Sequence, residues 1–155
     1  SQNMRDMAIG AGTVMTLEQL HMAADAGARY IISPDVNPAL IAETKRLGLT
    51  SLPGAMSPTE IVAAWNAGAD AVKVFPIGDL GVGYLKAIRA PLSHIPLIAV
   101  GGVNERNCAD FLRAGAIGVG VGGQLVNREW IDAGEFYKIA SLAGKIAQAA
   151  QNAVK

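Results

Sequence analysis

"NAGADAVKVF", residues 66–75, joins the end of a helix, a glycine and a short run of β-forming residues. Two other stretches repeat this pattern, "DAGARYIIS" (25–33) and "RAGAIGVGV" (113–121), and "RLGLTSLPG" (46–54) is a weaker copy. The glycine in each copy suits the left-handed backbone conformation that ends a helix, because glycine has no Cβ to clash there. The repetition predicts a chain built from successive helix–strand units.

The runs that follow these glycines, and two similar runs elsewhere, are strand candidates. We predict strands over residues 7–12, 28–33, 50–54, 70–75, 96–100 and 117–121. They are apolar throughout instead of alternating, which is typical of parallel strands covered on both faces. Strands that alternate with helices favour an α/β fold with right-handed crossovers, either a barrel or an open doubly wound sheet.

Short polar motifs indicate where the helices between these strands begin. Capping boxes are predicted at residues 16–19, 57–60 and 132–135, and helix N-caps at Asn37 and Asn104. In such a box the first side chain accepts a hydrogen bond from the third helical N–H, and the third side chain bonds back. These starts fall between the predicted strands, as an alternating α/β fold requires.

Length and composition favour one domain over residues 1–155, because no linker or low-complexity segment divides the chain. The 13 basic and 13 acidic residues balance, which argues against a nucleic-acid or membrane-binding surface. The single cysteine, Cys108, excludes an internal disulfide framework and suits a reducing compartment. The apolar runs are of strand length, so we expect a cytoplasmic protein without a transmembrane segment.

The residues after the predicted strands indicate where a ligand binds. In α/β folds, ligands bind at the carboxyl ends of parallel strands, where the following loops meet. Two of these loops carry consecutive glycines, "GGVN" (101–104) and "GGQ" (122–124). Backbone N–H groups and a helix N-terminus following them would hold a phosphate dianion. The alternative is that each glycine pair forms only a tight turn.

Lys73 stands inside a buried-looking strand. Side chains alternate along a strand, so Lys73 and Phe75 face away from Val72 and Val74. A buried ammonium group is unfavourable unless paired, and the nearest acid, Asp70, lies on the other face. Desolvation lowers the pKa of a lysine and leaves a nucleophilic amine, which can form a Schiff base with a ketone. The alternative is a lysine whose ammonium extends from the strand end to solvent.

Six motifs together resemble one family. In chain order they are "IGAGTV" (9–14), "ISP" (32–34), "PGAMSPTE" (53–60), "KVFP" (73–76), "GGV" (101–103) and "GVGGQLV" (120–126). In this order they resemble the KDPG/KHG aldolases, which cleave 2-keto-3-deoxy-6-phosphogluconate, its phosphogalactonate epimer or 4-hydroxy-2-oxoglutarate. The resemblance covers nearly the whole chain. It implies a (β/α)8 barrel and a class I, Schiff-base aldolase that acts on a phosphorylated keto acid. It also implies a homotrimer that needs no metal or cofactor.

The resemblance also assigns roles to residues. The Schiff-base lysine falls on Lys73, and the threonine that contacts the pyruvate part of the substrate falls on Thr13. We also place Pro34 and Phe75 beside the substrate, and the alternative for Phe75 is a place in the core. The phosphate-binding loops fall on Gly101, Gly102, Gly122 and Gly123. Many family members have serine at the last of these positions, so a hydroxyl contact to phosphate is lost here while the backbone N–H remains.

The chain departs from the family at its beginning. The motif "GAGTV" (10–14) belongs to the third strand of the family barrel, and we count six strands where the barrel needs eight. The acid/base glutamate and a carboxylate-binding arginine come from the family's second strand, and no residue here matches them by motif. We therefore expect a longer parent chain with two further βα units before Ser1. Two alternatives remain: a non-catalytic phosphate-binding barrel, and a barrel isomerase in which Lys73 acts as a charge.

Overall fold

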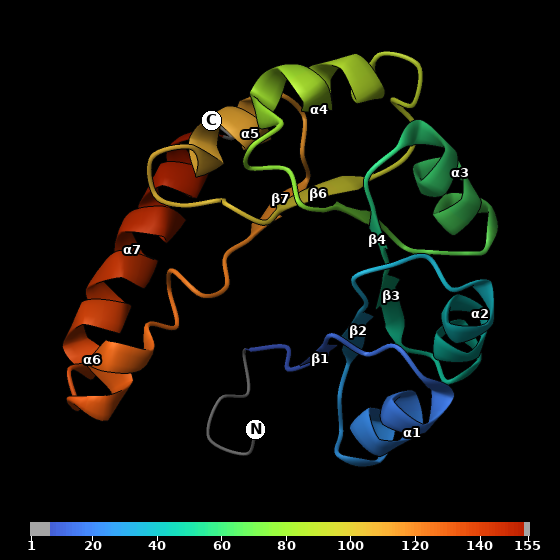
Figure 1. Cartoon of the computed structure of the whole chain (residues 1–155), viewed down its shortest axis with the longest axis horizontal. Helices are drawn as coiled ribbons and strands as arrows, with labels where there is room; N and C mark the ends of the chain where they lie inside the picture. The colour runs from blue at the N-terminus through green and yellow to red at the C-terminus, as the bar shows by residue number, and fades with distance from the viewer. Residues whose placement is uncertain (1–6, 154–155) are drawn as a thin grey trace. The chain divides into compact units, whose positions relative to one another are not determined.

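The computed structural model describes residues 7–153, and its strands pair in parallel and alternate with helices (Figure 1). The chain divides into two compact units, residues 1–75 and 76–155. The prediction of a single domain stays a prediction.

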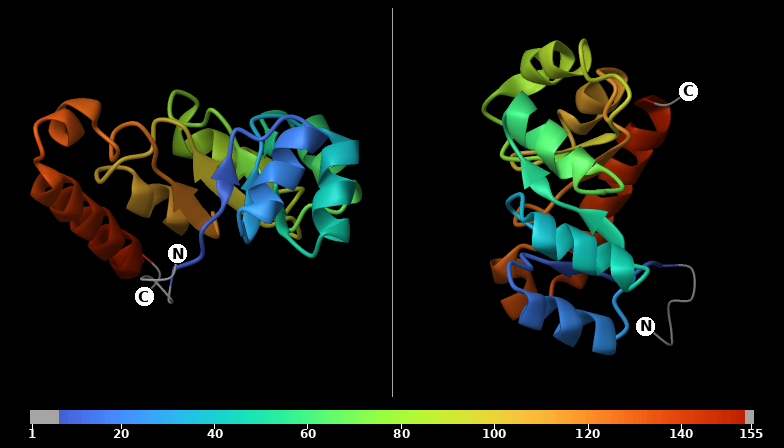
Figure 2. Two further views of the ribbon diagram at one scale, coloured as in Figure 1. Left: turned by 90° about the horizontal axis from the view of Figure 1, so that it is seen from below. Right: turned by 90° about the vertical axis from the view of Figure 1, so that its right-hand side faces the viewer.

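In the first unit, residues 7–75 form five short strands and three helices. The strands are β1 (Ala11–Gly12), β2 (Tyr30–Ile32), β3 (Thr50–Leu52), β4 (Gly54–Ala55) and β5 (Val72–Val74). The helices are α1 (Leu17–Asp25), α2 (Pro38–Arg46) and α3 (Pro58–Asn66). β2 pairs with both β1 and β3, and β4 pairs with β5. The three helices are stacked in chain order along one side of these strands (Figure 2, right).

In the second unit, residues 76–153 form two strands and four helices. The strands β6 (Leu97–Val100) and β7 (Gly118–Gly120) pair in parallel. The helices are α4 (Gly81–Arg89), α5 (Cys108–Arg113), α6 (Arg128–Asp132) and α7 (Phe136–Ala153). α7 packs against α5 and buries Ile146. No helix among residues 7–153 is long and apolar enough to cross a membrane.

Four helices end in the same hydrogen-bonded motif. After α1, α2, α3 and α5 comes a glycine with positive φ, at Gly27, Gly48, Gly68 and Gly115. At the end of α1, for example, the Gly27 N–H donates to the Ala24 carbonyl and the Ala28 N–H donates to the Ala23 carbonyl. This pair of bonds satisfies carbonyls that have no partner within the helix. The predicted helix–glycine–strand repeat is confirmed.

Three helix starts also follow the local sequence. The capping boxes of α1 and α3 are confirmed: the hydroxyls of Thr16 and Ser57 each accept from the third helical N–H. The side chains of Gln19 and Glu60 accept hydrogen bonds in return from the N-cap backbone. Asn37 caps α2 as predicted, with its side-chain oxygen accepting from two helical N–H groups.

Two predicted helix starts are wrong. α5 begins at Cys108 and not directly after Asn104, because the residues after Asn104 first form a turn held by its own side chain. Asp132 is the last residue of α6, Gly134 takes a φ of 70° beyond it, and α7 begins only at Phe136. The sequence pattern of a capping box is present at residues 132–135, but these residues form the end of α6 and the connection to α7.

The six predicted strands are all present, and most are shorter than predicted. The segment predicted as one strand over residues 50–54 is divided at Pro53 into β3 and β4. Proline has no N–H to donate to a neighbouring strand, so a ladder is interrupted at that position. The Pro53 carbonyl still accepts a hydrogen bond of 2.8 Å from the Lys73 N–H.

The two faces of β5 differ as predicted. Val72 and Val74 are fully buried, and β5 contacts α3. Lys73 and Phe75 lie on the other face and are half-buried. In β5, therefore, the valine face is removed from solvent, whereas the face that carries Lys73 and Phe75 is only half-buried.

Candidate functional site

Every predicted site residue lies in a strand or in the loop that follows it. Thr13 follows β1 and Pro34 follows β2, while Lys73 lies in β5 and Phe75 directly after it. The glycine pairs Gly101–Gly102 and Gly122–Gly123 follow β6 and β7. These are the carboxyl ends of parallel strands, where ligands bind in folds of this kind.

Lys73 and Phe75 form a direct contact. The Lys73 Nζ lies over the Phe75 ring, 4.1 Å from its centroid. Burial lowers the pKa of Lys73, because water no longer stabilises its charged form. The face of the ring acts in the opposite direction, since its negative quadrupole attracts a cation. The amine is therefore easier to deprotonate than a surface lysine, and its head group is held against an aromatic face.

No carboxylate in the described part of the chain pairs with Lys73. Asp70, the nearest acid in the sequence, is engaged elsewhere. One of its oxygens lies 2.6 Å from the Lys45 Nζ, and the other accepts a hydrogen bond of 2.7 Å from the Ser51 N–H. Asp70 thereby joins α2 and β3 to the start of β5. The inference that Asp70 does not neutralise Lys73 agrees with this geometry.

Thr13 has a strained backbone. Its φ is 61°, and it is the one residue other than glycine with a positive φ among residues 7–153. A β-branched side chain in this region is a real outlier. Such strain persists only where the surrounding structure imposes it, and it is concentrated at functional positions. The strain marks Thr13 independently of any motif.

The first glycine loop packs tightly against the loop that follows β5. The Gly78 N–H donates to the Gly101 carbonyl at 2.7 Å. A Cβ on Gly102 would come within 2.9 Å of the Gly78 Cα, and φ is 75° at Gly102. No larger residue fits at Gly102 without moving this backbone. The sequence analysis assigns no role to Gly78; the signal that could have found it is a glycine shortly after a strand, in a chain whose other strands are followed by glycine-rich loops.

The two glycine loops present unpaired backbone donors. The N–H groups of Gly102, Val103 and Gly123 have no acceptor in the part of the chain that the structure describes. The expected helix N-termini are not adjacent to the glycine pairs, because α5 begins at Cys108 and α6 at Arg128. Loop N–H groups, rather than helix ends, are therefore the donors an anion would meet first.

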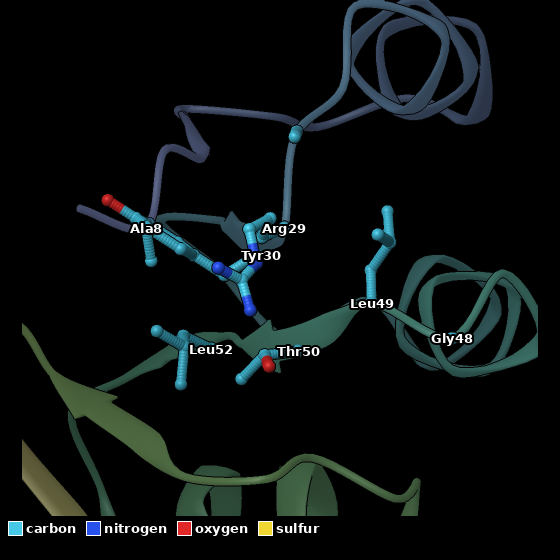
Figure 3. Close-up of a pocket in the computed structure, with 8 residues that line it drawn as sticks. Ala8, Arg29, Tyr30, Gly48, Leu49, Thr50 and Leu52 are labelled. Atoms are coloured by element: carbon cyan, nitrogen blue, oxygen red, sulfur yellow. The ribbon is translucent and has the colours of Figure 1, made fainter. Parts of the chain in front are cut away.

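A pocket of about 410 Å³ lies elsewhere in the first unit (Figure 3). It is lined by Ala8, Ala28, Arg29, Tyr30, Gly48, Leu49, Thr50 and Leu52. Most of these residues lie at the amino ends of β2 and β3, and none is a predicted site residue. Ligand sites in parallel β/α folds lie at the opposite, carboxyl ends of the strands. This pocket is therefore not a candidate for the predicted substrate site.

Cys108 and His21, whose side chains can bind metal ions, lie outside the predicted site residues. Cys108, the first residue of α5, is fully buried. The His21 Nε2 lies 3.3 Å from the Glu43 carboxylate on the surface of α1 and α2. Among residues 7–153, no three His, Cys, Asp or Glu side chains are grouped as metal ligands.

Comparison with known proteins gives consistent matches. A family model described as KDPG and KHG aldolase matches residues 1–142. A probable 2-dehydro-3-deoxy-6-phosphogalactonate aldolase of Rhizobium meliloti (strain 1021) is 44% identical over 118 residues. That alignment covers 76% of this chain and 56% of the relative, so the chain spans little more than half of the relative's length.

Solved structures show the same likeness. A structure titled "Native KDPGal structure" matches with a TM-score of 0.91 and 35% identity, over 99% of this chain and 73% of that one. A KDPG aldolase from Legionella pneumophila, with pyruvate captured as a covalent carbinolamine, matches with a TM-score of 0.80 and 29% identity. That match covers 94% of this chain and 70% of the other. The predicted fold class, that of the (β/α)8 barrels with six βα units in this chain, is confirmed.

Proposed function

This chain belongs to the KDPG and KHG aldolase family, and we propose that it acts as a class I aldolase on a 2-keto-3-deoxy-6-phospho sugar acid. The products are pyruvate and glyceraldehyde 3-phosphate. The observation that carries the proposal is the Lys73 amine, which is half-buried, has no carboxylate partner among the described residues and has a lowered pKa. The covalent pyruvate adduct named for the Legionella pneumophila relative is the chemistry that such an amine performs.

The neutral Lys73 amine attacks the keto carbon of the substrate and forms a carbinolamine. Uptake of a proton and loss of water give a protonated imine, which draws electrons from the C3–C4 bond of the substrate while the C4 hydroxyl loses its proton. That bond breaks, the aldehyde leaves, and an enamine remains on Lys73. Protonation of the enamine carbon and hydrolysis of the imine release pyruvate and restore the amine. No residue among those described is assigned to the proton transfers.

The rest of the site binds the two ends of the substrate. We assign the pyruvate end to Thr13, Pro34 and Phe75, which lie at or directly after strand ends in the same unit as Lys73. The phosphate end is assigned to the loops at Gly101–Gly102 and Gly122–Gly123, whose unpaired N–H groups are suitable donors. Because Gly123 supplies no hydroxyl, backbone donors carry phosphate binding in the second loop.

The phosphogalactonate epimer is the first substrate to test. The Rhizobium meliloti relative is named for that substrate. The phosphogluconate epimer and 4-hydroxy-2-oxoglutarate, which would yield glyoxylate with pyruvate, are the comparisons. A homotrimer in the cytoplasm is also proposed, on family likeness, and sedimentation of the full-length protein measures the assembly.

Borohydride reduction in the presence of pyruvate tests the activity. We expect the wild-type protein to gain one reduced pyruvyl group on Lys73, located by mass spectrometry of its peptides. Lys73→Ala should abolish both trapping and cleavage, whereas Lys86→Ala, on an exposed position of α4, should change neither. A non-catalytic barrel or an isomerase would remain unlabelled, and an adduct on another lysine would contradict the assignment.

A further inference from the structure

The two glycine loops each hold one peptide carbonyl by a donor further along the chain. In the second loop this is done by the backbone: the Gly122 carbonyl accepts from the N–H groups of Leu125 and Val126, at 2.9 and 3.0 Å. In the first loop it is done by a side chain: the Gly102 carbonyl accepts from the Asn107 Nδ2 at 3.0 Å. The Asn107 side chain thus supplies to the Gly102 carbonyl the hydrogen bond that backbone N–H groups supply to the Gly122 carbonyl.

The Asn107 amide is itself fixed in one orientation. Its Oδ1 accepts a hydrogen bond of 2.8 Å from the Asn104 N–H, so its NH₂ group must point the other way, towards Gly102. Asn104 Nδ2 approaches the same Gly102 carbonyl at 3.4 Å and is the weaker donor. Although Asn107 precedes α5, its side chain makes no capping hydrogen bond to that helix. Among the described residues, the hydrogen bonds of its side chain are all made to the loop.

Fixing the Gly102 carbonyl also fixes the next N–H. In a trans peptide the carbonyl and the following N–H point in opposite directions. The bond to Asn107 therefore turns the Val103 N–H away from Asn107. Val103 is 3% exposed, and its N–H has no acceptor among the described residues. Backbone N–H groups of buried residues are nearly always hydrogen-bonded. The Val103 N–H is therefore a suitable donor for an acceptor on a bound ligand.

We propose that Asn107 is a positioning residue for the phosphate site: it orients the Gly102–Val103 peptide so that the Val103 N–H meets a phosphate oxygen of the substrate. The proposal rests on the function proposed above and adds a residue that does not touch the substrate. It predicts that Asn107 affects phosphorylated ligands and leaves the chemistry at Lys73 unchanged.

The test uses Asn107→Ala and Asn107→Asp in the full-length protein. Alanine removes both side-chain bonds, while aspartate keeps the acceptor for Asn104 and loses the donor to Gly102. We expect both variants to raise the KM for a phosphorylated keto acid about tenfold, the effect of one lost hydrogen bond to a charged group. The KM for 4-hydroxy-2-oxoglutarate and the rate of pyruvate trapping should stay within about twofold of wild type.

Asn37→Asp is the matched control, because it also replaces an amide NH₂ group by a carboxylate oxygen. At Asn37, however, the hydrogen bonds to the helix are accepted by the side-chain oxygen, which aspartate keeps. It should keep the wild-type KM for both substrates. A wild-type KM in Asn107→Ala, or an equal rise for both substrates, would overturn the proposal. If the alanine variant does not fold, Asn107→Ser, which keeps an oxygen before the helix, gives the same comparison.

Binding of inorganic phosphate tests the role of Asn107 separately from the proposed aldolase function. Calorimetry measures its affinity without any turnover, and Asn107→Ala should weaken it about tenfold relative to wild type. A wild-type protein that binds phosphate but traps no pyruvate would overturn the aldolase function and leave the role of Asn107 standing. Trapping of pyruvate with unchanged phosphate affinity in the variant would overturn the role of Asn107 alone.

Discussion

Thr13 shows at the level of one residue how function and backbone strain coincide. A residue other than glycine in a sparsely populated region costs about 1–3 kcal/mol, and Thr13 is β-branched with a φ of 61°. The following residue is fixed, since the Val14 N–H donates to the Ile32 carbonyl at 3.2 Å and the Val14 side chain is buried. The backbone at Thr13 therefore has little freedom to relax. A strained residue other than glycine at this position indicates that its side chain has a function.

Thr13→Gly should separate stability from activity. Glycine relieves the strain but adds about 0.5–1 kcal/mol of unfolded-chain entropy, so we expect the free energy of unfolding to stay level or rise by about 1 kcal/mol. Catalytic efficiency should fall, because the side chain proposed to contact pyruvate is gone. Thr59→Gly, at an exposed position in α3, is the control and should lower stability. Equal destabilisation of both variants in urea titrations would show that Thr13 carries no strain.

The pH dependence of imine formation reports the surroundings of Lys73. Because burial lowers its pKa, the neutral amine should accumulate at a lower pH than for a free lysine. Pyruvate trapping should therefore rise with pH and level off below the pH expected for an unperturbed amine. Pentafluorophenylalanine at position 75 keeps the ring but removes the attraction for a cation, and should shift the rise to still lower pH. The same replacement at Phe111, buried in α5, is the control.

At the level of elements, the sequence predicted the helix ends that depend on hydrogen bonds between residues close in the chain. The helix ends at Gly27 and its repeats, and the capping boxes of α1 and α3, depend on residues within one turn of each other, and these predictions are confirmed. The start of α5 is different. Asn104 is predicted as its cap, but the helix begins at Cys108, and the Asn107 side chain before it donates to the Gly102 carbonyl in the preceding loop. Helix-capping rules do not include that bond.

Asp70 provides an element-scale prediction about stability. Its exposed ion pair with Lys45 should contribute less than about 1 kcal/mol. Its bond to the N–H of Ser51, a buried residue, matters more, because removing it leaves a backbone donor unsatisfied at a loss of about 1–3 kcal/mol. Asp70→Ala should therefore destabilise the protein clearly more than Lys45→Ala in urea unfolding. Similar losses in the two variants would assign the stabilisation to the ion pair instead.

For the molecule as a whole, the order of motifs was the informative part of the sequence. Composition and periodicity alone left a barrel and an open sheet both possible, since the two share the same alternation of strands and helices. The ordered motifs implied the family and the barrel fold, and the comparisons confirmed both. The roles of Lys73, Thr13 and the glycine loops stay predictions. Contacts between loops, such as Gly78 against Gly102, could not be derived, because strand ends carry no periodic signal.

Ligand binding should be visible in the stability of the whole protein. A ligand that binds only the folded state raises the free energy of unfolding, by about 2.7 kcal/mol at one hundred times its Kd. Inorganic phosphate should therefore raise the Tm of the wild-type protein above that in chloride at equal ionic strength. Gly102→Ala should lose this rise, because the added Cβ would meet the Gly78 Cα at 2.9 Å and disturb the loop. Gly144→Ala, in α7 with open space around the new Cβ, should keep it. An equal phosphate response in both variants would place the anion elsewhere on the molecule.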